Sequence, residues 1–563
     1  MRRVALVVLP LIAALAAVAN TRITDWGVMT DELLYAKLAT SAWDEATLLP
    51  ILHGERVGFL AMVYPLLIAP FYGTLGAVDA YHAALVISTA FSASAALPAY
   101  LLARTVLPRA WATVAALLAV VTPWLVLSAF LLTEAVAYPV FLWTMLACCR
   151  ACAHPGRRND ALAVALLALA FLTRTQFLVL VLALPPAVVL YELGGGGRWT
   201  DALRRAVSRH RTLVGTYALA VAAAVPLILV GGPERVLGSY AVTATQGSLL
   251  PRDTWRSAAL HLDQVAIGLG VAPFLIGAAW IFPAALRARA ESSRAFAAFA
   301  AVVLVALPLE VGSFALRFGA NVARDRYAFY LAPLLLIGAL SFVVEGRRRV
   351  HAVLVVTALF AATVHWQAFP ERDGISPDSP GSLLNNVLRA APLSPGVLVS
   401  VCGLVIGGAA ALALARLPRR VVAPAFAATF AAFAAAMTAG AFIALLTSPS
   451  SAERVKTGDQ QRALDWVEQA VPEGARVAIA ASPVTADWSD TAVRWWDVEF
   501  WNRNVREAVV GPGGKWTYTS FPTRELNEAE ARYLVIADGD SRFRAAGPRI
   551  AGSDGLSLIA LEG

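Results

Sequence analysis

The chain has 563 residues, of which 58% are hydrophobic and 15% are charged, and its formal net charge is +8. Soluble domains carry about 25% charged residues, so this composition excludes an ordinary soluble protein. The basic residues are divided among short loops between apolar runs, a pattern that membrane topology explains, and we therefore expect no nucleic-acid partner.

Apolar runs long enough to cross a bilayer as helices recur along most of the chain. The first, at 4–20, resembles a signal peptide, but its long apolar core favours an uncleaved span. Placing the arginine-rich short loops in the cytoplasm predicts about thirteen spans, with the N-terminus inside and the C-terminus outside. The later spans are expected at 79–103, 110–129, 135–153, 160–173, 177–192, 212–231, 264–286, 295–314, 327–344, 350–366, 396–415 and 421–446.

One apolar segment, "VGFLAMVYPLLIAPFYGTLG" at 57–76, does not fit this alternation. If it crossed the membrane, every later loop would change sides and the arginine clusters would lie outside. Its prolines and glycines also interrupt a helix. We therefore expect an interfacial or re-entrant segment on the outer side, and residues 21–78 become one external loop. A long polar external loop is expected at 232–263.

The composition changes after residue 447, where "TSPSSAERVKTGDQQ" is typical of a linker. Helical spacing follows at 458–470, and strands are expected at 476–482, 506–511, 532–538 and 556–562. The sequence thus predicts a polytopic α-helical membrane domain at 1–447 and a small extracytoplasmic α/β domain at 448–563. The aromatic residues of the second domain indicate either a structural core or a sugar-stacking surface: Trp488, Trp495, Trp496, Phe500 and Trp501.

Two cytoplasmic segments are also distinctive. "GGGG" at 194–197 lacks the lysine of a phosphate-binding P-loop, so we interpret it as a flexible linker. The amphipathic "TDALRRAVSRHRTL" that follows is expected to lie on the anionic inner leaflet.

Asp31 and Glu32 stand side by side near the start of the first external loop, in "TDELLYAKLA". Thr30 can cap a helix that begins there, and acids are favourable in a first turn, so a structural role is one interpretation. The other is catalytic, because a carboxylate at a membrane surface can act as a general base toward a hydroxyl or an amine. Arginines on the same outer face could bind the phosphate of a lipid-linked donor.

This acidic pair, followed by Tyr35, resembles the first external loop of the GT-C superfamily of membrane glycosyltransferases, above all the protein-mannosyltransferase and aminoarabinose-transferase branch. The likeness covers residues 1 to about 345 and includes "VYPLLIAPFYG", "LLTEAVAYPVF", "FLTRTQFLVLVLALP" and "DRYAFYLAPLLL". It implies a bacterial cell-envelope enzyme of the plasma (inner) membrane. Such an enzyme transfers a sugar from a polyprenyl-phosphate donor to an extracytoplasmic acceptor, with inversion.

The resemblance implies roles for the acids. Asp31 would be the general base that deprotonates the acceptor. Glu32 would orient the acceptor or tune Asp31, since two neighbouring carboxylates tend to raise the pKa of one of them. Glu134, in the next external loop, would meet the acceptor or, as in metal-using relatives, a divalent cation; whether a metal is needed is left open. The structural alternative for Glu134 is an ion pair with an arginine.

It implies roles for the bases as well. Arg324 and Arg326 would face the donor phosphate, with Arg56 and Arg174 as further candidates. The plain alternative for Arg324 and Arg326 is that they anchor a span at the interface. His53 stands where relatives carry a polar or His-Pro motif, although no "HPP" occurs here.

Two other classes of function compete with glycosyl transfer. A secondary transporter or a flippase of lipid-linked sugars would carry polar groups at mid-membrane depth, paired broken helices and often an internal repeat. The sequence shows few charges inside spans and no evident repeat. An assembly or sensor protein would leave the acidic pair dispensable. The sugar and the acceptor, whether a protein, a glycan or a lipid, are left open.

Overall fold

The computed structural model describes residues 2–23, 25–27, 29–58, 60–319, 322–345, 350–366, 379, 394–447, 464–480, 490–510, 523–538, 547–553 and 555–561. By their contacts the residues fall into two compact units, and each is described by itself. The helical unit comprises Met1–Ala16, Thr89–Leu127 and Glu134–Leu445. The mixed unit comprises Ala17–Ser88, Ser128–Thr133 and Leu446–Gly563.

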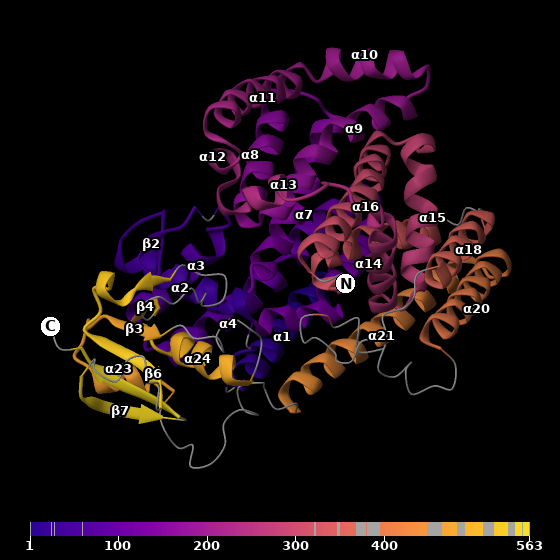
Figure 1. The fold of residues 1–563 in the computed structure, drawn as a ribbon. Helices are drawn as coiled ribbons and strands as arrows, with labels where there is room; N and C mark the ends of the chain where they lie inside the picture. The colour runs from indigo at the N-terminus through magenta and orange to yellow at the C-terminus, as the bar shows by residue number, and fades with distance from the viewer. Residues whose placement is uncertain are drawn as a thin grey trace. The chain divides into compact units, whose positions relative to one another are not determined.

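Helices, most of them long and apolar, make up the helical unit, and some of them continue into residues of the mixed unit, such as α1 after Ala16 and α4 up to Ser88 (Figure 1). Their bounds are α1 (Arg2–Asn20), α4 (Ala77–Ser94), α5 (Ala96–Ala103), α6 (Arg109–Val120), α7 (Glu134–Ala153), α8 (Arg157–Thr173), α9 (Leu178–Gly194), α10 (Trp199–Arg209), α11 (Arg211–Gly231), α14 (Thr254–Gly268), α15 (Ala272–Arg287), α16 (Glu291–Phe318), α17 (Ala332–Glu345), α18 (Val350–Trp366), α20 (Pro395–Arg416) and α21 (Arg419–Thr447). Short helices and 3-10 turns join them: η1 (Pro123–Ala129), η2 (Thr175–Phe177), α12 (Glu234–Leu237), η3 (Gly238–Ala241), α13 (Val242–Thr245), η4 (Asp325–Tyr327) and η5 (Phe329–Leu331).

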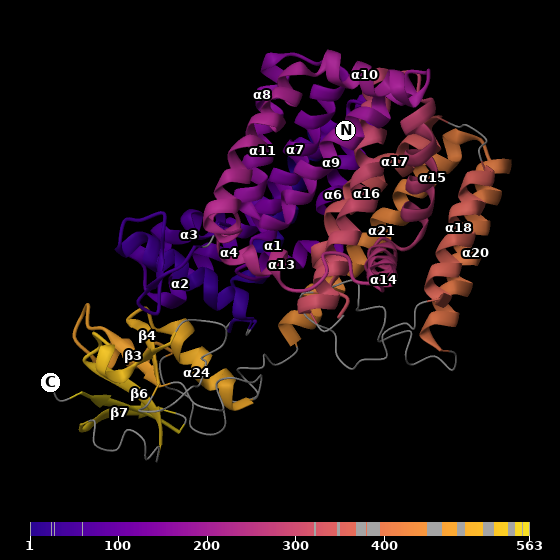
Figure 2. The same ribbon diagram turned by 45° about the horizontal axis from the view of Figure 1, so that its top comes forward.

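The helices confirm a multi-pass membrane protein. Within the described residues, seven helices are long and apolar enough to span a bilayer, or nine if two bent pairs each count as one span. Every predicted span coincides with helical structure. Within the described residues, the shorter apolar helices are Val8–Asn20, Phe329–Glu345 and Val350–Val364. Helix α7 is central, with 83% of its apolar window buried, whereas only 6% of the window of α11 is buried. Helices α18 and α20 lie side by side (Figure 2).

The predicted span at 264–286 was wrong in one respect, because two helices share it. Helix α14 begins within the predicted polar loop and ends at Gly268, and α15 departs from it at 119°. At the corner, Gly270 has φ 69° and Val271 has φ 65°. A left-handed backbone ends an α-helix, so the apolar run continues while the helix axis turns.

In the mixed unit, the segment predicted to be interfacial forms α3 (Val63–Thr74), which packs against α2 (Thr30–Asp44). Its 12 residues are too few to cross a bilayer. A hairpin of β1 (Ile51–Leu52) and β2 (Glu55–Arg56) precedes it.

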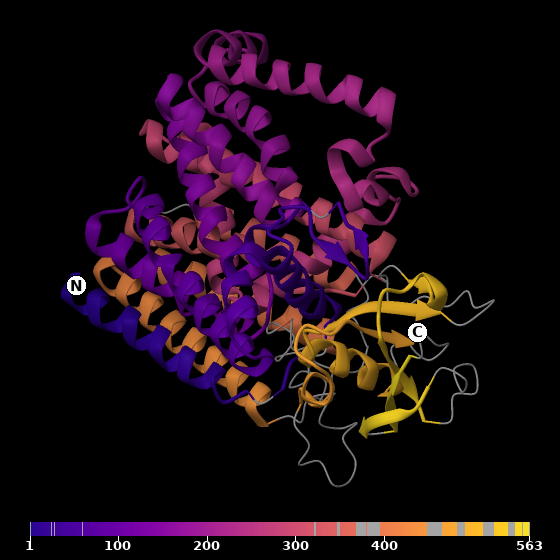
Figure 3. The same ribbon diagram turned by 90° about the vertical axis from the view of Figure 1, so that its left-hand side faces the viewer.

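The described C-terminal residues of the mixed unit form one six-stranded sheet in the order β5-β4-β3-β6-β8-β7. Its strands are drawn in orange to yellow near the C-terminus in Figure 3. The strands are β3 (Val477–Ala480), β4 (Val505–Val510), β5 (Arg524–Glu525), β6 (Tyr533–Ala537), β7 (Arg549–Ser553) and β8 (Leu556–Ala560). Pairing is parallel from β5 to β6 and antiparallel at β8 and β7. All four predicted strands are present. Of the predicted helix at 458–470, the part after residue 463 lies within the described residues and contains α23 (Trp466–Ala470).

The aromatic residues of this domain belong to a core. Helix α24 (Asp490–Trp501) carries Trp495, Trp496, Phe500 and Trp501, which are at most 3% exposed. Trp26 stacks on Phe500 with ring centroids 4.2 Å apart. For these four residues the structural interpretation is therefore correct. Trp488 lies outside the described residues.

Candidate functional site

The two candidate acids of the mixed unit begin helix α2. The N-cap is Met29, and no side chain caps the helix, so the predicted cap by Thr30 was wrong. Thr30 is instead the first helical residue, and its backbone is already committed to the helix. Asp31 and Glu32 occupy the first turn.

Glu32 is fully buried and holds two backbone segments together. Its Oε2 accepts a hydrogen bond from the N–H of Gly27 at 2.8 Å, and its Oε1 accepts one from the N–H of Leu131 at 3.0 Å. Asn20 holds the same second segment by donating from Nδ2 to the carbonyl oxygen of Ser128 at 3.1 Å. Burial raises the pKa of Glu32 to about 8, although the backbone hydrogen bonds oppose the rise. This carboxyl group therefore holds the backbone at Gly27 and Leu131 in place.

Asp31 differs from its neighbour because it is partly exposed. It is thus the acid of the pair that solvent can reach. Tyr35, one turn further on, is buried and meets the ring of Tyr64 edge to face at 5.8 Å. Tyr64 in turn shares a hydrogen bond with Ser88, so Tyr35 lies in packed surroundings.

The other candidates of the external loop lie on its hairpin. His53 is buried, and its Nε2 lies 2.7 Å from Oε1 of Glu499 on α24. Arg56 is exposed on β2. Lys37 of α2 donates from Nζ to the carbonyl oxygens of Asn502 and Val505. These contacts join the first loop to the C-terminal sheet domain within the mixed unit, and they give His53 a structural role.

In the helical unit, three predicted residues from distant parts of the chain come together. Glu134 opens α7 and is 1% exposed. Its Oε1 lies 2.8 Å from Nη1 of Arg174 and 3.8 Å from Nη1 of Arg326. Arg326 is buried, whereas Arg324, two residues earlier, is partly exposed.

Sequence reasoning missed two partners of this arginine cluster. Gln176 accepts a hydrogen bond from Nε of Arg174 at 2.8 Å and donates to the carbonyl oxygen of Tyr327 at 2.9 Å. The ring of Tyr327 lies beneath both guanidinium groups, 5.3 Å from Arg174 and 4.8 Å from Arg326. Both residues stand in stretches that carried the resemblance, which was the only signal for them. A guanidinium held by a carboxylate, an amide and a ring is fixed in orientation.

A metal ion does not fit this cluster. Among the residues that the structure describes, no group of three or more His, Cys, Asp or Glu side chains could hold one. Glu134 already faces two guanidinium groups, which would repel a divalent cation.

No family model matches the chain, and no curated protein matches it significantly. Solved structures do match. The aminoarabinose transferase ArnT from Cupriavidus metallidurans, in the apo state, aligns with a TM-score of 0.53 at 15% identity, over 100% of this chain and 98% of ArnT. The same protein bound to undecaprenyl phosphate gives 0.53 and 15%, over 99% and 97% of the two chains. The oligosaccharyltransferase AglB from Archaeoglobus fulgidus aligns at 0.41, which is too low to carry an argument. The chain therefore shares the fold of ArnT, as the resemblance in its sequence implied.

Proposed function

We propose that the protein transfers a glycosyl group from a polyprenyl-phosphate donor to an acceptor outside the cytoplasm. It would cross the plasma membrane thirteen times, with its N-terminus inside and its C-terminus outside. The fold supports this proposal, because ArnT shares it and has been solved with undecaprenyl phosphate bound. The observation that carries the proposal is the cluster of Arg174 and Arg326 around Glu134.

The arginine cluster suits a phosphate. Guanidinium groups bind phosphate oxygens through paired N–H donors, and they do so most strongly where little water competes. Arg326 is 4% exposed, and the side chain of Arg174 is 14% exposed. Glu134 and Tyr327 keep both groups in position before a ligand arrives, which lowers the entropy cost of binding. Arg324, partly exposed, is a further donor for the same phosphate.

Asp31 is the proposed general base because it is partly exposed and lies in the first turn of α2, at the positive end of the helix dipole. The acceptor oxygen or nitrogen attacks the anomeric carbon as its proton passes to the Asp31 carboxylate. The bond from the anomeric carbon to the phosphate oxygen breaks, and its electron pair leaves with polyprenyl phosphate. The configuration inverts, and no redox partner is needed. Glu32 contributes by holding the first turn of α2, which carries Asp31.

Purified full-length enzyme with polyprenyl-phosphate sugars and envelope acceptors tests the proposal. Asp31→Asn should lower kcat by about 10²–10⁴-fold, as expected for a lost general base, with little change in the donor KM. Arg326→Gln should chiefly raise the donor KM. The matched controls are Glu55→Gln and Arg158→Gln, both exposed residues, and each should behave like wild type. Wild-type turnover by folded Asp31→Asn would remove the proposed base.

One observation favours the transporter alternative, namely the two bent helix pairs. Helix α6 meets η1 at 51°, and α14 meets α15 at 119°. Broken helices often line transport sites. Sealed vesicles distinguish the two functions: a flippase would move the lipid-linked sugar between leaflets without an acceptor. A transferase would release polyprenyl phosphate only when an acceptor is present.

A further inference from the structure

Helix α10 (Trp199–Arg209) connects the ends of two apolar helices. Helix α9 ends at Gly194, and α11 begins at Arg211 after an eleven-residue helix that runs across the end of the bundle (Figure 1). Both neighbours are long and apolar enough to span a bilayer. A connection between two adjacent spans begins and ends at the same membrane face, so α10 lies at the membrane surface.

The two sides of α10 differ in what they meet. Ala202 and Ala206 are buried against the bundle. Trp199, Leu203 and Val207 follow one another at four-residue spacing, and they are 60%, 46% and 49% exposed. Residues four apart share one face of a helix, so these three side chains form a continuous apolar stripe. Such a stripe on a helix with a charged opposite face is typical of helices that lie in a membrane interface.

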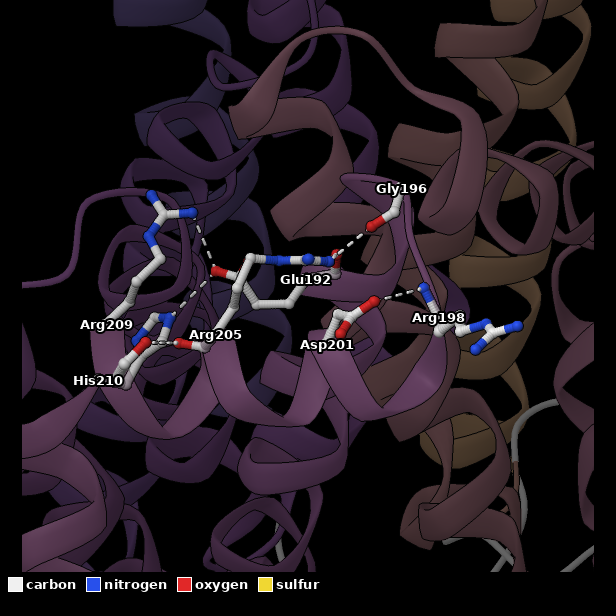
Figure 4. Close-up of polar contacts among 8 residues, drawn as sticks. Glu192, Gly196, Arg198, Asp201, Arg205, Arg209 and His210 are labelled. Atoms are coloured by element: carbon white, nitrogen blue, oxygen red, sulfur yellow. Dashed lines mark hydrogen bonds and ion pairs between the residues drawn. The ribbon is translucent and has the colours of Figure 1, made fainter.

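A buried carboxylate fixes which way this stripe faces. Glu192, on the last turn of α9, is 2% exposed. Its carboxylate accepts hydrogen bonds from Nε of Arg205 at 3.2 Å and from Nη1 of Arg209 at 3.0 Å (Figure 4). Arg205 also donates from Nη2 to the carbonyl oxygens of Glu192 and Gly196, at 2.8 and 2.6 Å. Helix α10 is therefore held along its Arg205 side, which leaves the apolar stripe turned away from α9.

The glycines between α9 and α10 allow the chain to make the turn that brings Arg205 to Glu192. Gly196 and Gly197 have φ angles of 94° and 96°, which only glycine adopts readily. They turn the chain sharply after α9, so that Arg205 reaches back to the Gly196 carbonyl. Asp201 closes the start of α10 by accepting a hydrogen bond from the N–H of Arg198. The segment "GGGG" is thus a defined turn, a more specific role than that of a flexible linker.

The exposed charges of this region are positive. Arg198, Arg204 and Arg211 are exposed, and Asp201 is the one acid within α10. Arg204 directly follows Leu203 of the stripe, so its long side chain can reach the headgroup level while the stripe is buried. Bases that flank an apolar stripe complement the phosphates of anionic lipids.

We propose that α10 is a membrane-surface helix that binds anionic phospholipid. The stripe of Trp199, Leu203 and Val207 inserts between acyl chains, and the exposed arginines contact the headgroup phosphates. Glu192 is the positioning residue that sets the rotation of the helix. The proposal does not depend on glycosyl transfer, because it concerns a surface that a transporter of this fold would share.

Labelling the full chain in nanodiscs tests the insertion. A polarity-sensitive fluorophore is attached at Val207→Cys or, as the matched control, at Ser208→Cys, both in a Cys402→Ser background. Nanodiscs of phosphatidylcholine and phosphatidylglycerol contain a nitroxide-bearing lipid as quencher. We expect the label at 207 to be quenched and shielded from aqueous iodide, and the label at 208 to show the reverse. Adding Glu192→Gln should remove much of this contrast. Equal accessibility of both positions would overturn the proposal.

Two further measurements identify what α10 binds. Shielding at 207 that persists in lipid-free detergent, or that rises with protein concentration, would show a protein contact or a second copy and would overturn the lipid proposal. Binding of a fluorescent phosphatidylglycerol should weaken by roughly five-fold for each arginine replaced by glutamine at 198, 204 or 211. Arg158→Gln, an exposed base at the start of α8, should leave that affinity unchanged. An unchanged affinity in the triple variant would refute the headgroup contacts.

Discussion

The pH dependence of stability should depend on Glu32. Its pKa is raised from 4.5 to about 8 by burial, so the folded protein holds a proton at neutral pH that the unfolded chain releases. An acid with a raised pKa stabilises the fold fully below its unfolded value, and this contribution is lost as pH rises through the folded value. Stability should therefore decline from about pH 4.5 to pH 8 and then level off with respect to this group.

The size of the effect follows from the same values. Each pKa unit corresponds to 1.36 kcal/mol, so moving the pKa from 4.5 to about 8 corresponds to a loss of about 5 kcal/mol across this window. Glu32→Gln removes the titrating group. The amide nitrogen replaces one carboxyl oxygen that now accepts from Gly27 or Leu131, so the variant should also lose about 1–3 kcal/mol at low pH.

Thermal unfolding in detergent, followed from pH 4.5 to 8, measures this dependence. Wild type should lose melting temperature across the window, while Glu32→Gln should start lower and change much less. Glu55→Gln, an exposed carboxyl of the β1–β2 hairpin, is the control and should follow wild type. A Glu32→Gln variant that follows the wild-type slope would show that Glu32 does not carry the protonation change.

Three further outcomes follow from the contacts. Burial lowers the pKa of Lys37 to about 8, so stability should rise from pH 8 to about 10.5, and Lys37→Met should abolish that rise while lowering the melting temperature overall. Glu134→Gln leaves Arg174 and Arg326 close together without their carboxylate, so the free energy of unfolding should fall by about 3–5 kcal/mol. Added undecaprenyl phosphate should raise the melting temperature of this variant more than that of wild type. Trp26→Ala removes the stack on Phe500 and the hydrogen bond to Asp497, which should cost about 3–5 kcal/mol in denaturant unfolding, and Trp26→Phe should cost less.

Much of the fold could be predicted because hydropathy and charge act over whole segments. Each predicted span coincides with helical structure, and the four predicted strands coincide with β3, β4, β6 and β8. Long apolar runs must be helical in a bilayer, and short alternations of branched residues favour strands, so these assignments depend on many residues at once.

Features that depend on one or two residues were not predictable. The corner between α14 and α15 rests on the left-handed backbone at Gly270 and Val271, within a run that is apolar on both sides. Thr30 is a favourable capping residue, yet Met29 occupies the cap and Thr30 is the first helical residue.

In the candidate site, too, whole segments predict which side of the membrane a residue lies on, whereas single contacts decide how its side chain is placed. Charge topology placed Glu134, Arg174 and Arg326 on one face of the membrane, and the structure pairs them. It could not separate Asp31 from Glu32, since both begin the same helix. Successive residues on a helix point about 100° apart, so one carboxylate turns into the protein while its neighbour stays accessible. The buried Glu32 already accepts two backbone hydrogen bonds, and a base must be accessible to its substrate. Burial therefore divides the pair into a positioning acid and a proposed base.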